Sequence, residues 1–93
     1  MGDDMDPREI DVQFFSLISM LASACWQQLG KTPSQPGDAV ERDLAGAKST
    51  IEMLLMLRDK MWGNLTGTEE KLLDDTISKR QESYAEEAAE AEG

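Results

Sequence analysis

Few of the side chains that enzymes use for acid–base or nucleophilic chemistry occur in this sequence of 93 residues. Histidine, the commonest general base and metal ligand, is absent. Cys25 is the only cysteine, so neither a thiolate metal cluster nor a disulfide within the chain can form. It lies in an apolar stretch, where we expect a buried thiol, with a redox or intermolecular role as the alternative. We therefore predict no catalytic, metal-binding or cofactor-binding residue.

Paired acidic residues are the remaining candidates for chemistry. Glu69-Glu70 and Asp74-Asp75 are spaced so that a helix would place their carboxylates about one turn apart, which could hold a divalent cation. Acids at the start of a helix also interact favourably with the helix dipole, and we prefer that interpretation. No glycine pattern joins a strand to a helix, so a phosphate-binding loop is not expected.

The net charge of −10 belongs mostly to the two ends of the chain. Residues 1–11 carry five acids and one arginine, and residues 82–93 carry five acids and no base. We predict a disordered acidic tail at residues 1–10 and a second acidic tail at residues 86–93, both serving solubility. Because no basic stripe is present to contact phosphates, nucleic-acid binding is not expected.

The longest uncharged stretch, Val12 to Gly30, raises the question of a membrane span. A spanning helix needs roughly 20 mostly apolar residues, which this stretch nearly reaches. It also contains six polar side chains that would have to enter lipid: Gln13, Ser16, Ser19, Ser23, Gln27 and Gln28. The sequence starts with acidic residues where a signal peptide would be basic. We therefore expect no membrane span and a cytoplasmic protein.

Helical periodicity accounts for nearly all of the remaining sequence, and no alternating strand pattern is present. Asp11 is a suitable N-cap for a first helix, and Gly30 suits the left-handed position after its end. The linker that follows contains two prolines and a glycine within five residues, and it allows a second helix to return antiparallel to the first. We predict an all-α three-helix bundle in which the third helix packs across this hairpin. The predicted domain covers residues 11–85, with helices at about 11–29, 43–62 and 67–84.

The junction between the second and third helices carries the most specific local signals. Gly63 and Asn64 are residue types that tolerate positive φ, so we predict a tight turn there. Thr66 and Glu69 have the spacing of a capping box, in which each side chain accepts a hydrogen bond from the backbone N–H of the other residue.

The first predicted helix is apolar over about 200° of its circumference, twice the roughly 100° that is typical of a surface helix. The third helix offers only a thin apolar stripe, so a single chain would leave apolar surface uncovered. Because such a patch usually marks an interaction site, we predict a homo-oligomer, most simply a two-fold dimer. The residues expected at the contact lie about one turn apart along one flank of the first helix: Phe15, Ile18, Ala22 and Trp26.

One basic residue, Arg58, falls within the apolar arc of the second helix. Its aliphatic stem could pack on the core while its guanidinium reaches solvent or an acid. The alternative is a buried ion pair or an interface contact.

From Phe14 to Tyr84 the order of these signals resembles a small bacterial family catalogued as domain of unknown function 1844. The family's K-x-x-G-N-L-T-x-x-E-x-x-L-L block is similar to the stretch from Lys60 to Leu73. The sequence departs from the family at Arg80 and Gln81, which puts the packing of the third helix in doubt. The resemblance implies a small, bacterial, cytoplasmic protein, and it transfers no catalytic residue. Further matching positions are Phe14, Leu17, Ile18, Leu21, Ala22, Leu29, Gly30, Asp43, Leu44, Ala47, Ile51, Leu54 and Tyr84.

Three classes of function remain open from the sequence. We favour a non-enzymatic protein–protein interaction or oligomerisation module, whose partner is a second copy of the chain or an unknown protein. The first alternative is a membrane-peripheral or apolar-ligand-binding protein that uses the first helix. The second alternative is an enzyme with a carboxylate site that forms only in an oligomer.

Overall fold

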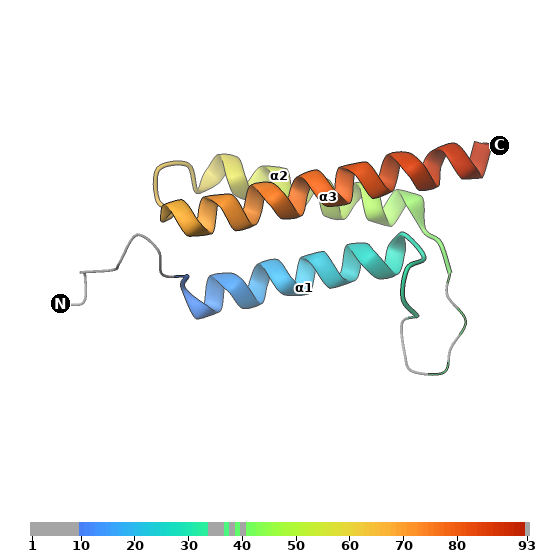
Figure 1. Ribbon diagram of the computed structural model, residues 1–93, viewed down its shortest axis with the longest axis horizontal. Coiled ribbons are helices and arrows are strands. Elements are labelled where there is room, and N and C mark those ends of the chain that lie inside the picture. The colour runs from blue at the N-terminus through green and yellow to red at the C-terminus, as the bar shows by residue number, and fades with distance from the viewer. Residues whose placement is uncertain (1–9, 34–36, 38, 40, 93) are drawn as a thin grey trace.

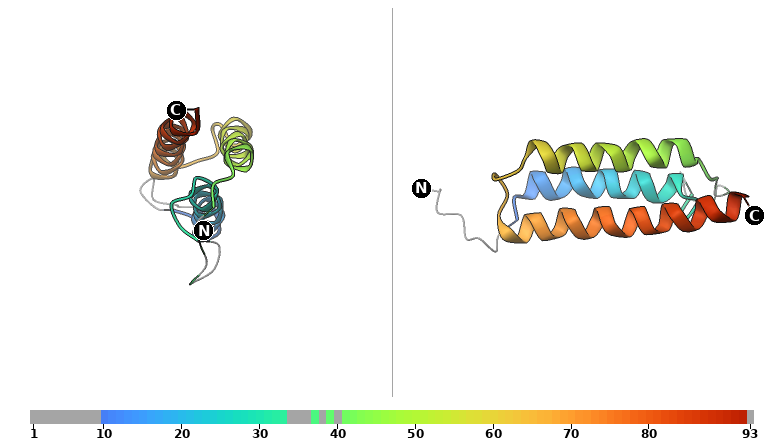
Figure 2. Two further views of the ribbon diagram at one scale, coloured as in Figure 1. Left: turned by 90° about the vertical axis from the view of Figure 1, so that its right-hand side faces the viewer. Right: turned by 90° about the horizontal axis from the view of Figure 1, so that it is seen from above.

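The computed structural model describes residues 10–33, 37, 39 and 41–92, and all regular structure within them is helical. Helix α1 covers Val12–Gln28, α2 covers Leu44–Lys60 and α3 covers Gly67–Glu92. In Figure 1, α1 runs from left to right, α2 returns, and α3 runs from left to right again. The two views of Figure 2 show three helices side by side, with α3 lying lengthwise beside the others. The predicted all-α three-helix fold is confirmed, but α3 does not cross the pair as expected.

Both ends of α1 are closed by the residues that the sequence indicated. The Asp11 carboxylate accepts hydrogen bonds from the backbone N–H groups of Gln13 and Phe14, at 2.8 and 3.0 Å. At the other end Gly30 has a φ of 80°, and its N–H donates to the Gln27 carbonyl at 2.9 Å. The next N–H, that of Lys31, donates to the Trp26 carbonyl at 3.0 Å, which completes a Schellman motif.

The Glu69 carboxylate joins the beginnings of two helices. One oxygen accepts from the Thr66 N–H at 2.9 Å while the Thr66 hydroxyl accepts from the Glu69 N–H at 3.1 Å, so the predicted capping box is confirmed. The other oxygen accepts from the Asp11 N–H at 2.7 Å. Glu69 is only 4% exposed. A single buried carboxylate therefore caps α3 and holds the N-cap residue of α1 against it. Gly63, in the turn before α3, has a φ of 84° as predicted.

Apolar side chains from all three helices fill the space between them in two clusters. The cluster nearer the α2–α3 turn contains Phe14, Ile18, Leu54, Leu73 and Ile77. The cluster nearer the α1–α2 linker contains Cys25, Leu29, Ala47 and Ile51, and Trp26 and Tyr84 are packed against it. Each fully buried aliphatic side chain contributes about 1.5–3 kcal/mol relative to exposure. The core thus fixes which side of each helix faces inward.

Close contact between α1 and α2 depends on Gly46. The Gln28 amide lies 2.8 Å from the Thr50 hydroxyl, and its nitrogen is directed toward the Ala24 and Gly46 carbonyls when the amide is oriented to satisfy both its ends. A Cβ atom on Gly46 would lie 3.0 Å from the Gln28 side-chain amide and would overlap the carboxylate of Asp43, which is the N-cap residue of α2.

Helix α3 continues to Glu92, eight residues beyond its predicted end at 84. Residues 86–92 are therefore helical turns of the domain, and the prediction of a separate acidic tail at 86–93 is wrong for them. The reason is a contact with the α1–α2 linker through Glu87, described below. The predicted N-terminal tail lies outside the described residues, except for the half-buried residue 10.

We expect Glu69→Ala to lower the free energy of unfolding by about 2–4 kcal/mol, because it removes the acceptor of the Thr66 and Asp11 N–H groups and an unsatisfied amide costs about 1–3 kcal/mol. Glu70→Ala is the matched control, because Glu70 is exposed on the same helix turn. Urea denaturation followed by circular dichroism measures both. Equal stability of the two variants would contradict the role of Glu69.

We expect Gly46→Ala to destabilise the fold by about 1–3 kcal/mol, although alanine ordinarily favours a helix over glycine by about 1 kcal/mol. The added methyl displaces either the Asp43 cap or the Gln28 amide. Gly67→Ala serves as the control, because a Cβ added there, at the start of α3, meets no neighbouring atom within 4 Å. Thermal unfolding should separate the two variants, and a Gly46→Ala protein as stable as the Gly67→Ala protein would refute the close contact.

Candidate interaction surface

Side chains of α2 and α3 cover most of the flank of α1 that we predicted to contact a partner. Ile18 is only 2% exposed and belongs to the core cluster with Leu54 and Leu73, so it cannot reach a second chain. Ala22 and Trp26 are half-buried, and both contact Arg80 of α3. Phe15 alone on this flank is 46% exposed. The expectation for Ile18 is wrong because periodicity gives the width of an apolar arc but not which neighbour covers each side.

Arg80 fills the seam between α1 and α3. Its Nε donates a hydrogen bond to the Ala22 carbonyl at 3.2 Å, and its guanidinium carbon lies 4.4 Å from the centre of the Trp26 ring. A cation over an indole face is a favourable arrangement, worth about 0.5–2 kcal/mol. Burial lowers the pKa of Arg80 from its ordinary value, although the group stays charged at neutral pH. An arginine within the thin apolar stripe of α3 was the sequence signal for this contact.

Four long apolar side chains remain exposed on α1 and α2, and we call them the methionine face. They are between 39% and 69% exposed and comprise Leu17, Met20, Met53 and Met56. Sequence analysis missed the three methionines. The available signal was their position outside the apolar arcs, where a large apolar residue has no neighbour within the chain.

The helix geometry places three of these side chains, Leu17, Met20 and Met53, along the sides where α1 and α2 meet, and Met56 lies one turn after Met53 on the outer side of α2. Leu17 precedes Gln28 by about three turns, so it lies on the side of α1 that faces α2, and Met20 follows one turn later. Met53 follows Gly46 by about two turns, which places it on the side of α2 that faces α1. Ile18 and Leu54 share one core cluster, so the exposed residues next to them lie at the same level of the bundle.

The surroundings of the methionine face on α1 are uncharged. No acidic or basic residue occurs between Val12 and Gln28, and the outward side chains are mainly serine and glutamine. Desolvating such groups costs far less than desolvating ions. A depression of about 390 Å³ lies between the start of α1 and the α2–α3 turn. Leu17 is the residue of the methionine face that lines it, and the acidic residues Asp11 and Glu69 line it as well. The other exposed large apolar side chains are Val12, Phe15 and Trp62, of which Val12 and Trp62 lie near that end of the bundle.

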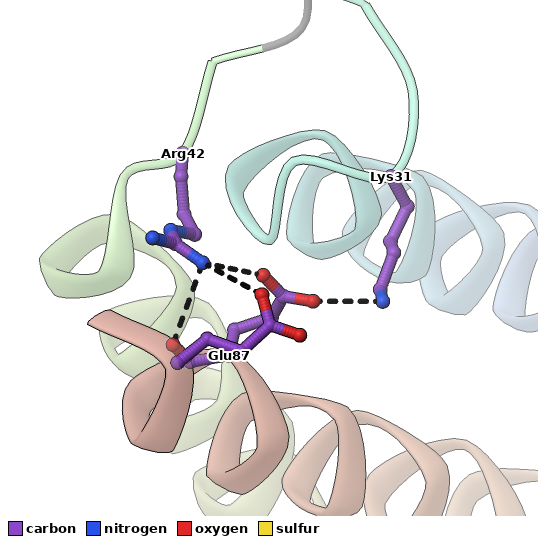
Figure 3. A network of polar contacts seen from close by, with 4 residues as sticks. Lys31, Arg42 and Glu87 are labelled. Carbon is purple, nitrogen blue, oxygen red and sulfur yellow. Dashed lines mark hydrogen bonds and ion pairs between the residues drawn. The ribbon is translucent and has the colours of Figure 1, made fainter. Parts of the chain in front are cut away.

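Charge is concentrated at the far end of α3. The Glu87 carboxylate lies 2.9 Å from the Lys31 ammonium and 2.8 Å from the Arg42 guanidinium, which come from the two ends of the α1–α2 linker (Figure 3). Arg42 also lies 3.5 Å from Glu90. The pKa of Glu87 is lowered, chiefly by the hydrogen bond from Lys31 and next by the hydrogen bond from Arg42. The hydrogen bond between Lys31 and Glu87 also raises the pKa of Lys31. This cluster holds the last turns of α3 against the linker.

The remaining candidate residues are engaged separately. Arg58 pairs with Asp74 at 3.4 Å, and both side chains are more than one-third exposed, so its guanidinium reaches an acid at the surface and the buried-pair alternative is wrong. Asp75 lies 3.5 Å from Lys71. The acidic pairs therefore do not converge, and within the described ranges no group of three metal-ligating side chains comes together.

Cys25 is fully buried in the second core cluster. Burial raises the pKa of its thiol, and the nearby charge of Arg80 only partly offsets this. Because the thiolate is the reactive form, the buried thiol acts as a packing group.

None of the helices formed by the described residues is long and apolar enough to cross a membrane.

Comparison with known proteins relates the chain to a family. Residues 11–86 match the family described as Domain of unknown function (DUF1844). No curated protein and no solved structure matches the chain.

The Glu87 cluster predicts a local response to acid. A lowered pKa means that its contribution to stability is complete above the ordinary glutamate range and is lost as the pH falls through that range to the lowered value. Raising the pH through neutrality should have no such effect, since the pKa of Lys31 is raised. We expect Glu87→Gln at neutral pH to accelerate amide hydrogen exchange in residues 85–92, as acid does in the unmodified protein. Glu82→Gln is the control, and identical exchange in the two variants would contradict the contact.

Proposed function

The chain belongs to the DUF1844 family. We propose that it is a non-enzymatic interaction module that pairs with a second copy of itself through the methionine face. The observation that carries the proposal is the exposure of Leu17, Met20, Met53 and Met56 on two helices that pack against each other. Large exposed apolar patches on small proteins usually mark interaction sites. Methionine is well suited to such a surface, because its flexible, polarisable side chain adapts to the opposing shape.

Charge favours a second copy as the occupant. Each chain carries a net charge of −10, most of it at the two ends of the sequence, so two copies repel one another where these ends approach. α1 carries no charge, and in a two-fold contact the same helix comes from both chains. The α1–α2 face is thus the surface where two such acidic chains can approach with the least repulsion. In this proposal α1 and α2 form an antiparallel hairpin that docks as a unit, in a bacterial, cytoplasmic protein.

The absence of histidine from the sequence supports the non-enzymatic part of the proposal. The separate engagement of Glu69, Asp74 and Asp75 supports it further, because a carboxylate site would need these side chains to converge.

Light scattering after gel filtration tests the pairing. We expect the unmodified protein to show twice the 10.3 kDa chain mass and to dissociate on dilution. Met20→Glu should raise the dissociation constant by at least about a hundredfold, since an unpaired charge buried at a contact costs about 3–5 kcal/mol. Because Met20 is exposed in the single chain, the helical circular dichroism of the Met20→Glu variant should match that of the unmodified protein.

Ser78→Glu is the matched control, because it adds the same charge at an exposed position of α3 away from the face. It should remain paired. A single-chain mass for the unmodified protein at every concentration would refute the proposal, as would a Met20→Glu protein that pairs normally.

A further inference from the structure

We propose that Met20, Met53 and Met56 form a modification site for peroxide-class oxidants, and that their conversion to methionine sulfoxide separates the paired chains. The inference rests on the proposed function, because it assigns a chemical regulation to the same face. The inference uses the sulfur content of the face, because three of its four long side chains are methionines.

The reaction is a two-electron oxygen transfer. The lone pair of the thioether sulfur attacks one oxygen of hydrogen peroxide, an S–O bond forms and the O–O bond breaks. The departing oxygen takes both peroxide protons and leaves as water. The sulfur is oxidised by two electrons and the peroxide is reduced by two, so no other co-reactant is needed. The product is reducible by methionine sulfoxide reductases, which makes the modification reversible.

Exposure selects these sulfur atoms from the others that the structure describes. Met20 is 69% exposed, and Met53 and Met56 are each 45% exposed. Met61 is half-buried and packs against the first core cluster. Cys25, the usual kind of redox sensor, has no exposed surface and sits among Leu29, Ala47 and Ile51. An oxidant in solution therefore meets the thioethers of the face before it meets the thiol.

The effect of oxidation follows from the composition of the face. A sulfoxide replaces an apolar, adaptable group by a strongly polar one, and polar groups buried without partners are costly. In a two-fold contact every oxidised residue occurs twice. Since Met20, Met53 and Met56 point away from the core of the single chain, their oxidation weakens the contact between chains without disturbing the fold.

Pairing and oxidation oppose each other on this account. The paired state covers the thioethers, so the oxidant reacts with the chain that has transiently dissociated, and each oxidised chain is removed from the equilibrium. The rate of sulfoxide formation at these positions should therefore fall as the protein concentration rises, whereas the rate at Met61, which lies outside the face, should not change.

The test treats the purified full-length protein with hydrogen peroxide and follows two quantities, the oxygen added at each methionine by peptide mass spectrometry and the molar mass by light scattering. We expect oxidation at Met20, Met53 and Met56 before Met61, and a change from paired to single chains in parallel. Treatment with methionine sulfoxide reductases should restore the paired mass, and circular dichroism should remain helical throughout.

The control replaces Met20, Met53 and Met56 together by leucine, which keeps the apolar area, removes the sulfur, and leaves the methionines at positions 1, 5 and 61. This variant should pair and should stay paired in peroxide. Oxidation of the three methionines without loss of pairing would overturn the inference. The inference would also be overturned if peroxide dissociated the paired leucine variant to the same extent as the unmodified protein. A single-chain mass before any peroxide is added refutes the pairing itself, and the inference falls with it. Should the triple variant fold poorly, Met20→Leu alone, at the most exposed position, should slow the release.

Discussion

The structure depends on the need to cover a helix that carries no charge. α1 is uncharged from Val12 to Gln28, and it is apolar around more of its circumference than one neighbour can bury. α2 and α3 lie along two of its sides and take Phe14, Ile18 and Cys25 into the core. Leu17 and Met20 of α1 remain exposed after this packing, as do Met53 and Met56 of α2. The methionine face is thus apolar surface that a chain of this size does not bury against itself.

Polar contacts at the two ends of the bundle fix its geometry, and apolar contacts fill its middle. At one end Glu69 caps α3 and accepts a hydrogen bond from the Asp11 N–H, so the starts of α1 and α3 cannot slide past each other. At the other end Glu87 receives Lys31 and Arg42 from the linker. These contacts occupy polar groups at both ends of the bundle, and the surface that we propose for a partner is the long side of the α1–α2 pair.

The local parts of this arrangement could be predicted from the sequence, since they depend on residues close together in the chain. The Asp11 cap, the Gly30 terminus, the Gly63 turn and the Thr66–Glu69 box are of this kind. The contacts that could not be predicted join distant residues. Glu87 extends α3 because the linker brings two cations to it, although the last turns bury almost nothing. Arg80 covers the flank that was expected to face a partner because α3 lies lengthwise rather than across. The methionine face was missed for a related reason, since only the placement of α2 and α3 shows which apolar side chains remain outside.

The central claim is that the methionine face is the surface by which two chains meet, and methyl NMR of selectively labelled methionine tests it most directly. In a dilution series the account predicts that the methyl signals of Met20, Met53 and Met56 shift together with one dissociation constant, while that of Met61, packed against the core, shifts little. Methyl signals of the three residues that stay constant over the whole concentration range, in a protein that remains a single chain, would contradict it.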